Sequence, residues 1–282
     1  MINFRQERDF NALISDTFEF IRQEFKPLTK SLITYAGPFI LITAFLAAMY
    51  QSSIYSNIGD PKEINDPLWG FKAMFGTKYL LYALSAAISN VVLTLVIYSY
   101  IKLYVERGKD NFSPEDVWRT VGYYFIPVFF ITIAIGFIIG FGLVLFIIPG
   151  IYFAIALIFT VYAKMAENLS FGDAMRRSMY LVKDNWWFTL GVILIIYFIA
   201  SFSGSIFLLP QIIYTFFIGM SAAKGSFEGV SSLFLIISAA GTFIATLFYS
   251  IIYITISFHY YSLVEQKDNP ELMNEINQIN EE

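Results

Sequence analysis

Cysteine is absent from the 282-residue chain, and histidine occurs once, as His259. Without cysteine the chain forms no disulfide, no thiolate metal site and no lipid attachment through a thiol. One histidine does not build a multi-histidine metal centre, and its position near the end of an apolar run is typical of an interfacial helix residue. We therefore predict no metal site and no cofactor.

Catalytic sequence patterns are missing as well. The sequence holds no Walker-type phosphate loop and no nucleophile elbow. Three acids in one loop, Asp60, Glu63 and Asp66, are able in principle to bind a divalent cation. Their spacing matches no calcium loop, so solvated loop charges are the favoured interpretation. We predict a non-enzymatic protein with no catalytic residues.

Charge is scarce and unevenly distributed. Only 14% of residues are charged, against about 25% in a typical soluble domain, while 57% are hydrophobic and the mean hydropathy is +0.62. Five stretches contain no Asp, Glu, Lys or Arg: 31–59, 79–101, 121–163, 185–223 and 229–264. A transmembrane helix needs about 20 mainly apolar residues, so each stretch holds at least one span and the third has room for two.

The economical interpretation is an all-α, polytopic membrane protein with six transmembrane helices. We place the spans at 31–52, 77–104, 120–146, 150–166, 187–208 and 231–263. They form a membrane domain over 31–264, between a polar N-terminal segment, 1–30, and a polar C-terminal tail, 265–282. Pro149 and Gly150 are expected to separate the third and fourth spans, since proline lacks the N–H that a helix needs. Residues 209–229 stay open between a re-entrant segment, an interfacial segment and a loop.

Basic residues predict the orientation. Six spans put both termini on one side, and 14 of the 18 Lys and Arg residues fall on that side. The positive-inside bias then predicts cytoplasmic termini in a bacterial inner membrane, with Trp118, Trp186 and Trp187 at the inner interface and Trp69 at the outer one. The predicted inner face carries 14 bases and 18 acids, and this balance argues against a nucleic-acid partner.

Two stretches outside the spans are amphipathic. In the first, Asp9 is a candidate N-cap, and Pro27 is expected to disrupt the helix before the first span. Its apolar face holds Phe10, Leu13, Ile14, Phe18, Phe20, Ile21 and Phe25. A helix of this kind is expected to lie along the inner interface.

The second amphipathic stretch, 170–184, follows the same plan. Ser170 is its candidate cap, and Asp173 and Arg177 have the order of a favourable i, i+4 pair. One arc of this helix carries Phe171, Ala174, Met175, Ser178, Met179, Leu181 and Val182.

Positions 161 residues apart in the two stretches carry side chains of similar character: Phe10 corresponds to Phe171 and Leu13 to Ala174. A third, shorter instance starts at Ser113, followed by Pro114 at the first helical position. Three repeated hairpin units, each led by a capped helix, are one interpretation. The other is that any interfacial helix must look amphipathic, and pattern alone does not separate the two.

Polar residues inside the spans are few. Asn90 and Thr94 lie in the second span, and Ser201, Ser203 and Ser205 in the fifth. They are candidate cavity-lining residues for a transporter, although helix packing is the favoured role of Asn90. Gly136-x-x-x-Gly140 and Ser238-Ala-Ala-Gly241 allow close helix approach.

Anionic lipid recognition is weakly signalled in the stretch 170–184, whose net charge is +1. The candidate lipid-phosphate contacts are Arg176, Arg177 and Lys183. A charge-driven lipid switch needs about four to eight clustered bases, so only a pocket for one phosphate between the two arginines stays open.

The stretch from Phe146 to Trp187 contains Pro149-Gly150-Ile151-Tyr152, Glu167 followed by Leu169-Ser170, Ala174, Arg176-Arg177-Ser178, Leu181 and a tryptophan at 186 or 187. In these features it resembles the membrane domain attached to some bacterial glycerophosphoryl diester phosphodiesterases, and related stand-alone membrane proteins of unknown function. The features lie within 42 of the 282 residues. In that family the phosphodiesterase chemistry belongs to a separate soluble domain, so the resemblance implies a six-helix membrane module without that activity.

The preferred hypothesis is an accessory or scaffold module that associates with membrane lipids or with a membrane or cytoplasmic protein partner. The alternative is a transporter or flippase for an apolar or lipidic substrate, which does not require charges within the membrane.

Overall fold

The computed structural model describes residues 2–57, 67–68, 71, 75–223 and 231–281. Within these ranges the chain is helical and contains no strand. Six helical segments are long and apolar enough to cross a membrane, which confirms the predicted all-α, six-helix membrane protein. Asp60, Glu63, Asp66 and Trp69 lie outside the described residues.

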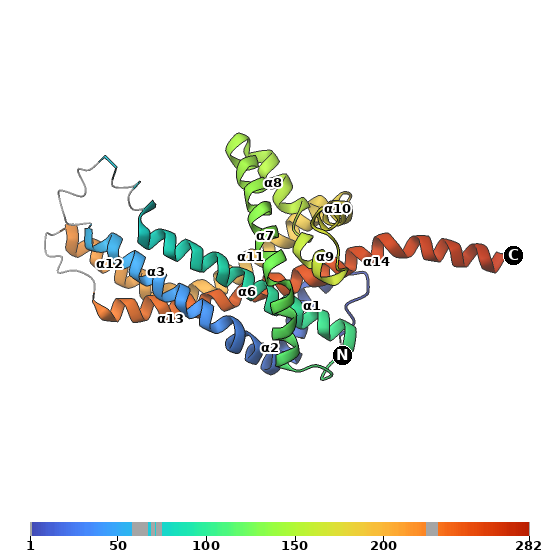
Figure 1. The fold of residues 1–282 in the computed structure, drawn as a ribbon, viewed down its shortest axis with the longest axis horizontal. Coiled ribbons are helices and arrows are strands. Elements are labelled where there is room, and N and C mark those ends of the chain that lie inside the picture. Colours follow the sequence, from blue (N-terminus) through green and yellow to red (C-terminus); the bar gives the residue numbers. More distant parts are fainter. Residues whose placement is uncertain (1, 58–66, 69–70, 72–74, 224–230, 282) are drawn as a thin grey trace. The chain divides into compact units, whose positions relative to one another are not determined.

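Several spans are built from more than one helix (Figure 1). The candidate spans are Phe25–Tyr55, Thr77–Arg107, Pro114–Leu145, Ile147–Ala166, Trp186–Ser221 and Ser232–Asp268. The described helices, which include a π-helical turn η1 and a 3-10 turn η2, are α1 (Phe10–Gln23), α2 (Phe25–Ser31), η1 (Leu32–Ala36), α3 (Gly37–Asn57), α6 (Thr77–Arg107), α7 (Pro114–Leu145), α8 (Ile147–Ala156), α9 (Thr160–Ala166), α10 (Phe171–Val182), α11 (Trp186–Ser205), η2 (Ile206–Leu208), α12 (Leu209–Ala223), α13 (Ser232–Phe248) and α14 (Ser250–Glu281).

The chain divides into two compact units. Unit 1 contains Met1–Ser31, Thr94–Phe198 and Ser250–Glu282, and unit 2 contains Leu32–Leu93 and Ile199–Tyr249. The C-terminal stretch that the sequence predicts as a polar tail continues α14, which runs to Glu281.

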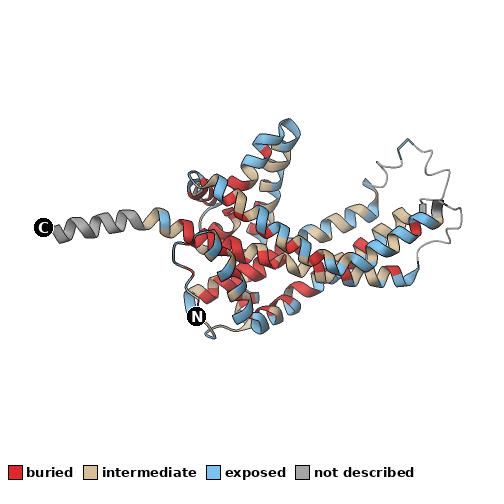
Figure 2. Ribbon diagram, turned by 180° about the vertical axis from the view of Figure 1, so that it is seen from behind, coloured by how far each residue is buried: buried red, intermediate tan, exposed pale blue. Residues whose placement is uncertain are grey.

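Unit 1 has an aromatic core around the first half of α14, where buried residues gather (Figure 2). Phe4 stacks on Phe258 with ring centroids 4.1 Å apart, and Phe20 meets Tyr104 edge to face at 5.2 Å. These rings are almost completely buried. Large buried aromatics contribute about 1.5–3 kcal/mol each in transfer free energy, so they hold the N-terminal segment and α1 against α6 and α14.

The break before the first span falls at Glu24, so the predicted break at Pro27 is wrong. Pro27 lies in the first turn of α2, where a helix does not need its N–H. The buried Glu24 carboxylate accepts from Tyr100 Oη at 2.7 Å and lies 3.0 Å from Lys109 Nζ. This contact with Glu24 raises the pKa of Lys109. The two partners hold Glu24 where the helix axis changes.

The break between the third and fourth spans lies at Phe146, which has extended backbone, so the predicted break at Pro149-Gly150 is also wrong. Those two residues lie in the first turn of α8, where Pro149 again fits. Gly150 allows α8 to approach α7 closely: a Cβ on Gly150 would lie 2.5 Å from Leu143 Cγ and 2.6 Å from Leu143 N. Glycine is therefore needed at position 150 because α8 lies close to α7 there, and not because the chain turns at this residue.

The fourth span is itself interrupted between α8 and α9. Ser178 on α10 accepts from the Phe159 N–H at 3.1 Å and donates to the Ala156 carbonyl at 2.7 Å. Buried backbone groups freed by a helix break need partners, and one hydroxyl supplies two of them here. The amphipathic helix α10 therefore holds the interrupted span in place.

The helices α1 and α10 match in more than amphipathic character. Asp9 and Ser170 are N-caps whose side chains accept from the backbone N–H three residues on, at Ala12 and Asp173. Three pairs of positions 161 residues apart are buried in both helices: 13 and 174, 17 and 178, 20 and 181. This agreement supports a repeat for these two helices.

The third proposed unit departs from that plan. Ser113 and Asp116 form the expected capping box, but α7 then runs without interruption from Pro114 to Leu145. No separate amphipathic helix precedes the span in this described stretch. Superposition of the three hairpins stays a prediction.

Unit 2 contains α3 packed against α13, with α12 also on α13. Close approach depends on Gly241, where a Cβ would lie 2.6 Å from the Phe207 carbonyl oxygen, and on Gly204 beside Ala245. The Gln211 side chain donates to the Gln51 side chain at 2.5 Å. Of the residues left open by the sequence, 209–223 form α12, which continues the fifth candidate span, and 224–230 lie outside the described part.

Replacing Gly150 by Ala should destabilise the α7–α8 hairpin by about 1–3 kcal/mol, because the new methyl group meets both the backbone and the side chain of Leu143. The measurement is the free energy of unfolding in detergent. Gly136→Ala is the matched control: a Cβ there meets nothing within 4 Å, so stability should be unchanged or slightly raised. Equal stabilities of the two variants would contradict the close crossing.

Candidate functional site

The N-terminal segment is fixed to unit 1 by Arg8, whose side chain is 0% exposed. Its guanidinium donates to Asp16 Oδ2 at 2.8 Å, to the Phe4 carbonyl at 2.7 Å and to the Asn3 carbonyl, and it lies 4.7 Å from the centroid of the Phe258 ring. Burial lowers the pKa of Arg8, and the Asp16 carboxylate opposes that shift. A buried charge is stable only with such partners.

The backbone that follows is attached to α14 and to α1. The Arg8 N–H donates to Ser262 Oγ at 2.9 Å, and the Ala12 N–H donates to the Asp9 carboxylate at 2.8 Å. The segment thus enters α1 in a defined path beside α14, and this path forms one wall of a pocket.

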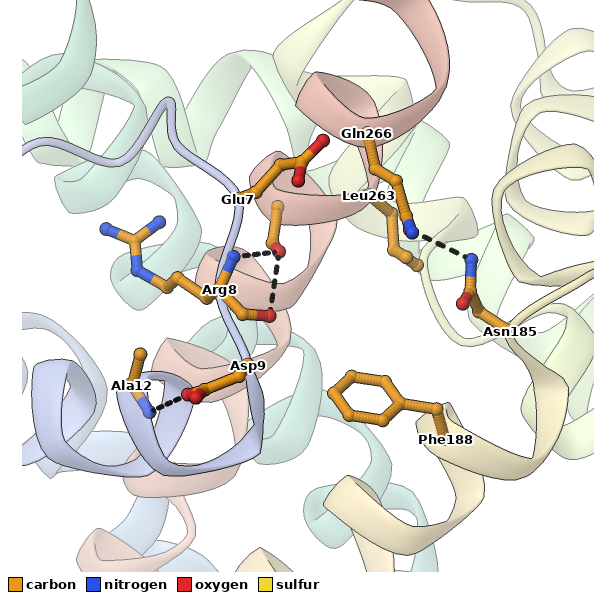
Figure 3. A pocket seen from close by; sticks show the side chains of 9 residues that line it. Glu7, Arg8, Asp9, Ala12, Asn185, Phe188, Leu263 and Gln266 are labelled. Carbon is orange, nitrogen blue, oxygen red and sulfur yellow. Dashed lines mark hydrogen bonds between the residues drawn. The ribbon is translucent and has the colours of Figure 1, made fainter.

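The pocket lies between the N-terminal segment, the start of α11 and α14 (Figure 3). It has a volume of about 640 Å³, and its lining residues are Glu7, Arg8, Asp9, Ala12, Asn185, Phe188, Ser262, Leu263 and Gln266. The Asn185 amide donates to Gln266 Oε1 at 3.1 Å and so joins α14 to the residue just before α11. We name it the N-terminal pocket.

The side chains of the N-terminal pocket favour hydrogen-bond donors as ligands. The Arg8 guanidinium points away from Phe188 and Asn185 (Figure 3), because it is held by Asp16 and by backbone carbonyls. Glu7 is exposed and carries an acceptor carboxylate. Ala12, Phe188 and Leu263 add apolar surface. The pocket therefore combines an acidic rim, amide groups and an apolar wall.

A second polar cluster centres on Arg177, which connects three elements. Its Nε lies 2.9 Å from Glu167 Oε1, and its two terminal nitrogens lie 3.2 and 2.5 Å from the Asp268 carboxylate. The Tyr260 hydroxyl also donates to Glu167. The hydrogen bond to Asp268 is the main reason that the pKa of Arg177 is raised. Arg177 thus fastens α10 to α14.

The expected i, i+4 pair between Asp173 and Arg177 is not what the structure shows. Asp173 accepts from the Ser170 hydroxyl and lies 2.6 Å from Arg176 instead. The Ser170 hydroxyl, followed by Arg176, lowers the pKa of Asp173. Arg177 prefers carboxylates on other elements because α10 turns it towards α14.

The three candidate phosphate contacts are in different surroundings. The Arg176 side chain is 74% exposed, the Arg177 side chain is 18% exposed and held by two carboxylates, and Lys183 is exposed at the end of α10. Adjacent helical residues point about 100° apart, and here that separation sends the arginines to different partners. A phosphate clasped between the two arginines would have to displace the Arg177 ion pairs.

The candidate cavity-lining residues are distributed over the two units. Thr94 is buried in unit 1, while Asn90, Ser201, Ser203 and Ser205 belong to unit 2. Ser205 donates to the carbonyl of Phe202 at 2.8 Å, a bond within its own helix. Three pockets of unit 1, the N-terminal pocket and two along α7, are lined by other residues.

His259, which the sequence predicts to be an interfacial helix residue, is fully buried in unit 1. Its Nε2 lies 2.9 Å from Thr189 Oγ1, and its ring contacts Phe159 and Phe188. Within the described ranges, no group of three or more His, Asp or Glu residues is placed to hold a metal ion.

Sequence reasoning missed Glu7, Asn185 and Gln266 as residues of one pocket. Asn185 precedes a pair of tryptophans at the start of a span, and tryptophans at such a position predict the membrane interface. No local pattern connects Asn185 to Glu7 or Gln266. The comparisons add nothing to this assignment: no protein-family model, no curated protein and no solved structure matches the chain. The resemblance noted for Phe146–Trp187 stays a prediction.

Replacing Arg177 by Gln should lower the free energy of unfolding by about 1–3 kcal/mol, because Glu167 and Asp268 lose a charged donor that is largely shielded from solvent. Unfolding in detergent at neutral pH measures the effect. The adjacent Arg176→Gln is the control, since its pair with Asp173 is exposed to solvent and should contribute little to stability. A loss as large in Arg176→Gln would refute the proposed role of Arg177.

Proposed function

We propose that the protein is a non-enzymatic, multi-pass module of the bacterial inner membrane that holds the headgroup of a membrane lipid in its N-terminal pocket, as a lipid-associated accessory or scaffold protein. The excess of basic residues on the side of both termini supports cytoplasmic termini. The N-terminal pocket then faces the inner leaflet.

The observation that carries this proposal is the position of the pocket together with its mixed lining. Its walls run from the charged residue Glu7 to Phe188 in the first turn of the span-forming helix α11, next to Trp186 and Trp187. Tryptophans of this kind mark the depth at which lipid headgroups meet acyl chains. A site that is polar on one side and apolar on the other suits an amphiphile at that depth.

The chemistry of the lining also supports a particular way of binding. A headgroup with N–H or O–H donors would find the exposed Glu7 carboxylate and Asn185 Oδ1, since Gln266 Oε1 already accepts from Asn185, while Phe188 and Leu263 contact the glycerol and upper acyl region. A protein partner that inserts a donor-rich side chain would use the same groups and is an outcome of the experiment below. In the transporter alternative the substrate would contact Asn90, Thr94 and the serines of α11, and none of these residues lines the three pockets described above.

Filling the pocket should remove bound lipid. Ala12 lies on the pocket wall and Asn11 is exposed one position away, outside the lining. Native mass spectrometry of the full chain extracted with its lipids should therefore show several-fold less retained lipid for Ala12→Phe than for Asn11→Phe, at equal melting temperature.

Equal lipid retention by Ala12→Phe, Asn11→Phe and the unchanged protein would refute a lipid site in this pocket. A photo-crosslinking residue at position 12 identifies the occupant, because the mass of the adduct separates a lipid from a polypeptide. A polypeptide adduct at position 12, absent with the same residue at position 11, would replace the lipid by a protein partner.

A further inference from the structure

An apolar groove runs along α7 in unit 1. This groove shares no lining residue with the N-terminal pocket. Its volume is about 570 Å³, and its lining residues are Pro127, Phe130, Ile131, Ile133, Ala134, Phe137, Lys164 and Phe171. Six of these eight belong to α7, and Lys164 is the one charged residue among them. We name it the α7 groove.

The α7 groove has the length of one acyl layer. From Pro127 to Phe137 an α-helix advances about 15 Å, which is half of the roughly 30 Å hydrocarbon thickness of a bilayer. A second apolar depression of about 390 Å³, which shares Ile133 and Phe137 with it, continues the surface to Val144. At Gly136 and Gly140 a Cβ would meet nothing within 4 Å, so no other described segment covers this surface.

Lys164 lies at the end of the α7 groove nearest the start of α7. One turn before Pro127, Tyr124 Oη lies 3.5 Å from the Met165 carbonyl and 3.4 Å from Asn168 Oδ1, which brings this part of α7 beside the end of α9. Phe171, the first residue of α10, lines the same end. The groove is therefore apolar along its length and basic at one end.

The Lys164 ammonium keeps binding capacity. It donates to the Leu169 carbonyl at 2.5 Å, which uses one of its three N–H donors. Within the described part of the chain no carboxylate lies within 4 Å of its Nζ. The carboxylates of the neighbouring loop and helix are engaged elsewhere, Glu167 by Arg177 and Asp173 by Arg176 and Ser170.

We propose that the α7 groove binds a phospholipid with an anionic headgroup, whose phosphate lies against Lys164 and whose acyl chain lies along Pro127–Phe137. The apolar length selects an acyl chain, and the single cation at its end selects a negative charge at the depth of the headgroup. This assignment replaces Arg177 by Lys164 as the phosphate contact. It goes beyond the proposed function, because it concerns a different site and a different headgroup chemistry.

The test uses the full-length protein in mixed micelles containing equal amounts of phosphatidylglycerol and phosphatidylcholine, with bound lipid counted by native mass spectrometry. One basic residue near the headgroups contributes about 1 kcal/mol, so the expected preference for phosphatidylglycerol is about fivefold. Because the hydroxyl donors of phosphatidylglycerol also suit the N-terminal pocket, the variants are compared in the Ala12→Phe background, where that pocket is filled. There Lys164→Gln should abolish the preference, and Lys164→Arg should keep it. Lys30→Gln, which removes an exposed lysine outside the groove, should leave it unchanged.

A second variant separates a lipid site from a site for free phosphate. Ala134→Phe fills the α7 groove without touching Lys164 and should reduce retention of phosphatidylglycerol, whereas inorganic phosphate should not displace the lipid. The proposal fails if Lys164→Gln keeps the preference, if Ala134→Phe retains as much phosphatidylglycerol as the unchanged protein, or if inorganic phosphate displaces it. Ala12→Phe, which fills the N-terminal pocket, removes the contribution of that pocket to the bound phosphatidylglycerol. The part of the preference that depends on Lys164 should persist in this background, so failure at either site is recognised separately.

Discussion

Burial of the Arg8 guanidinium is the interaction on which the organisation of unit 1 depends. A charged side chain that is completely withdrawn from solvent is tolerated only when its donors are matched, and Arg8 finds Asp16, backbone carbonyls and the face of Phe258. These partners lie on the N-terminal segment itself, on α1 and on α14. Their arrangement fixes the path of residues before α1, and that path makes one wall of the N-terminal pocket.

Buried polar groups also need hydrogen-bonding partners at two of the helix breaks. At Glu24 a buried carboxylate is held by Tyr100 and Lys109, and between α8 and α9 the Ser178 hydroxyl serves two freed backbone groups. In an apolar environment an unpartnered backbone group costs several kcal/mol, so the two bonds of Ser178 stabilise the break between α8 and α9, while at the Phe146 break the N–H keeps a helical bond to the Gly142 carbonyl. The interruptions are therefore tertiary features, and the amphipathic helices α1 and α10 are part of the membrane domain's core.

Both candidate sites follow from this arrangement. The N-terminal pocket exists because the segment around Arg8 is held beside α14, and the α7 groove has a basic end because α9 and α10 bring Lys164 and Phe171 to α7. The first site is rich in hydrogen-bond acceptors and the second carries a cation, so they suit different polar groups. Together they support the proposal of a membrane module with two distinct surfaces for amphiphiles.

Sequence alone predicted the helical class, the six membrane helices and the caps at Asp9, Ser113 and Ser170, because apolar run length and cap chemistry are local properties. It failed at Pro27 and at Pro149-Gly150, since proline fits the first turn of a helix as well as a break. Tertiary structure alone decided the burial of His259, the choice of Asp268 by Arg177, and the meeting of Glu7, Asn185 and Gln266 around one pocket. These contacts join residues 70 or more positions apart, and their selection depends on packing, which no local pattern records.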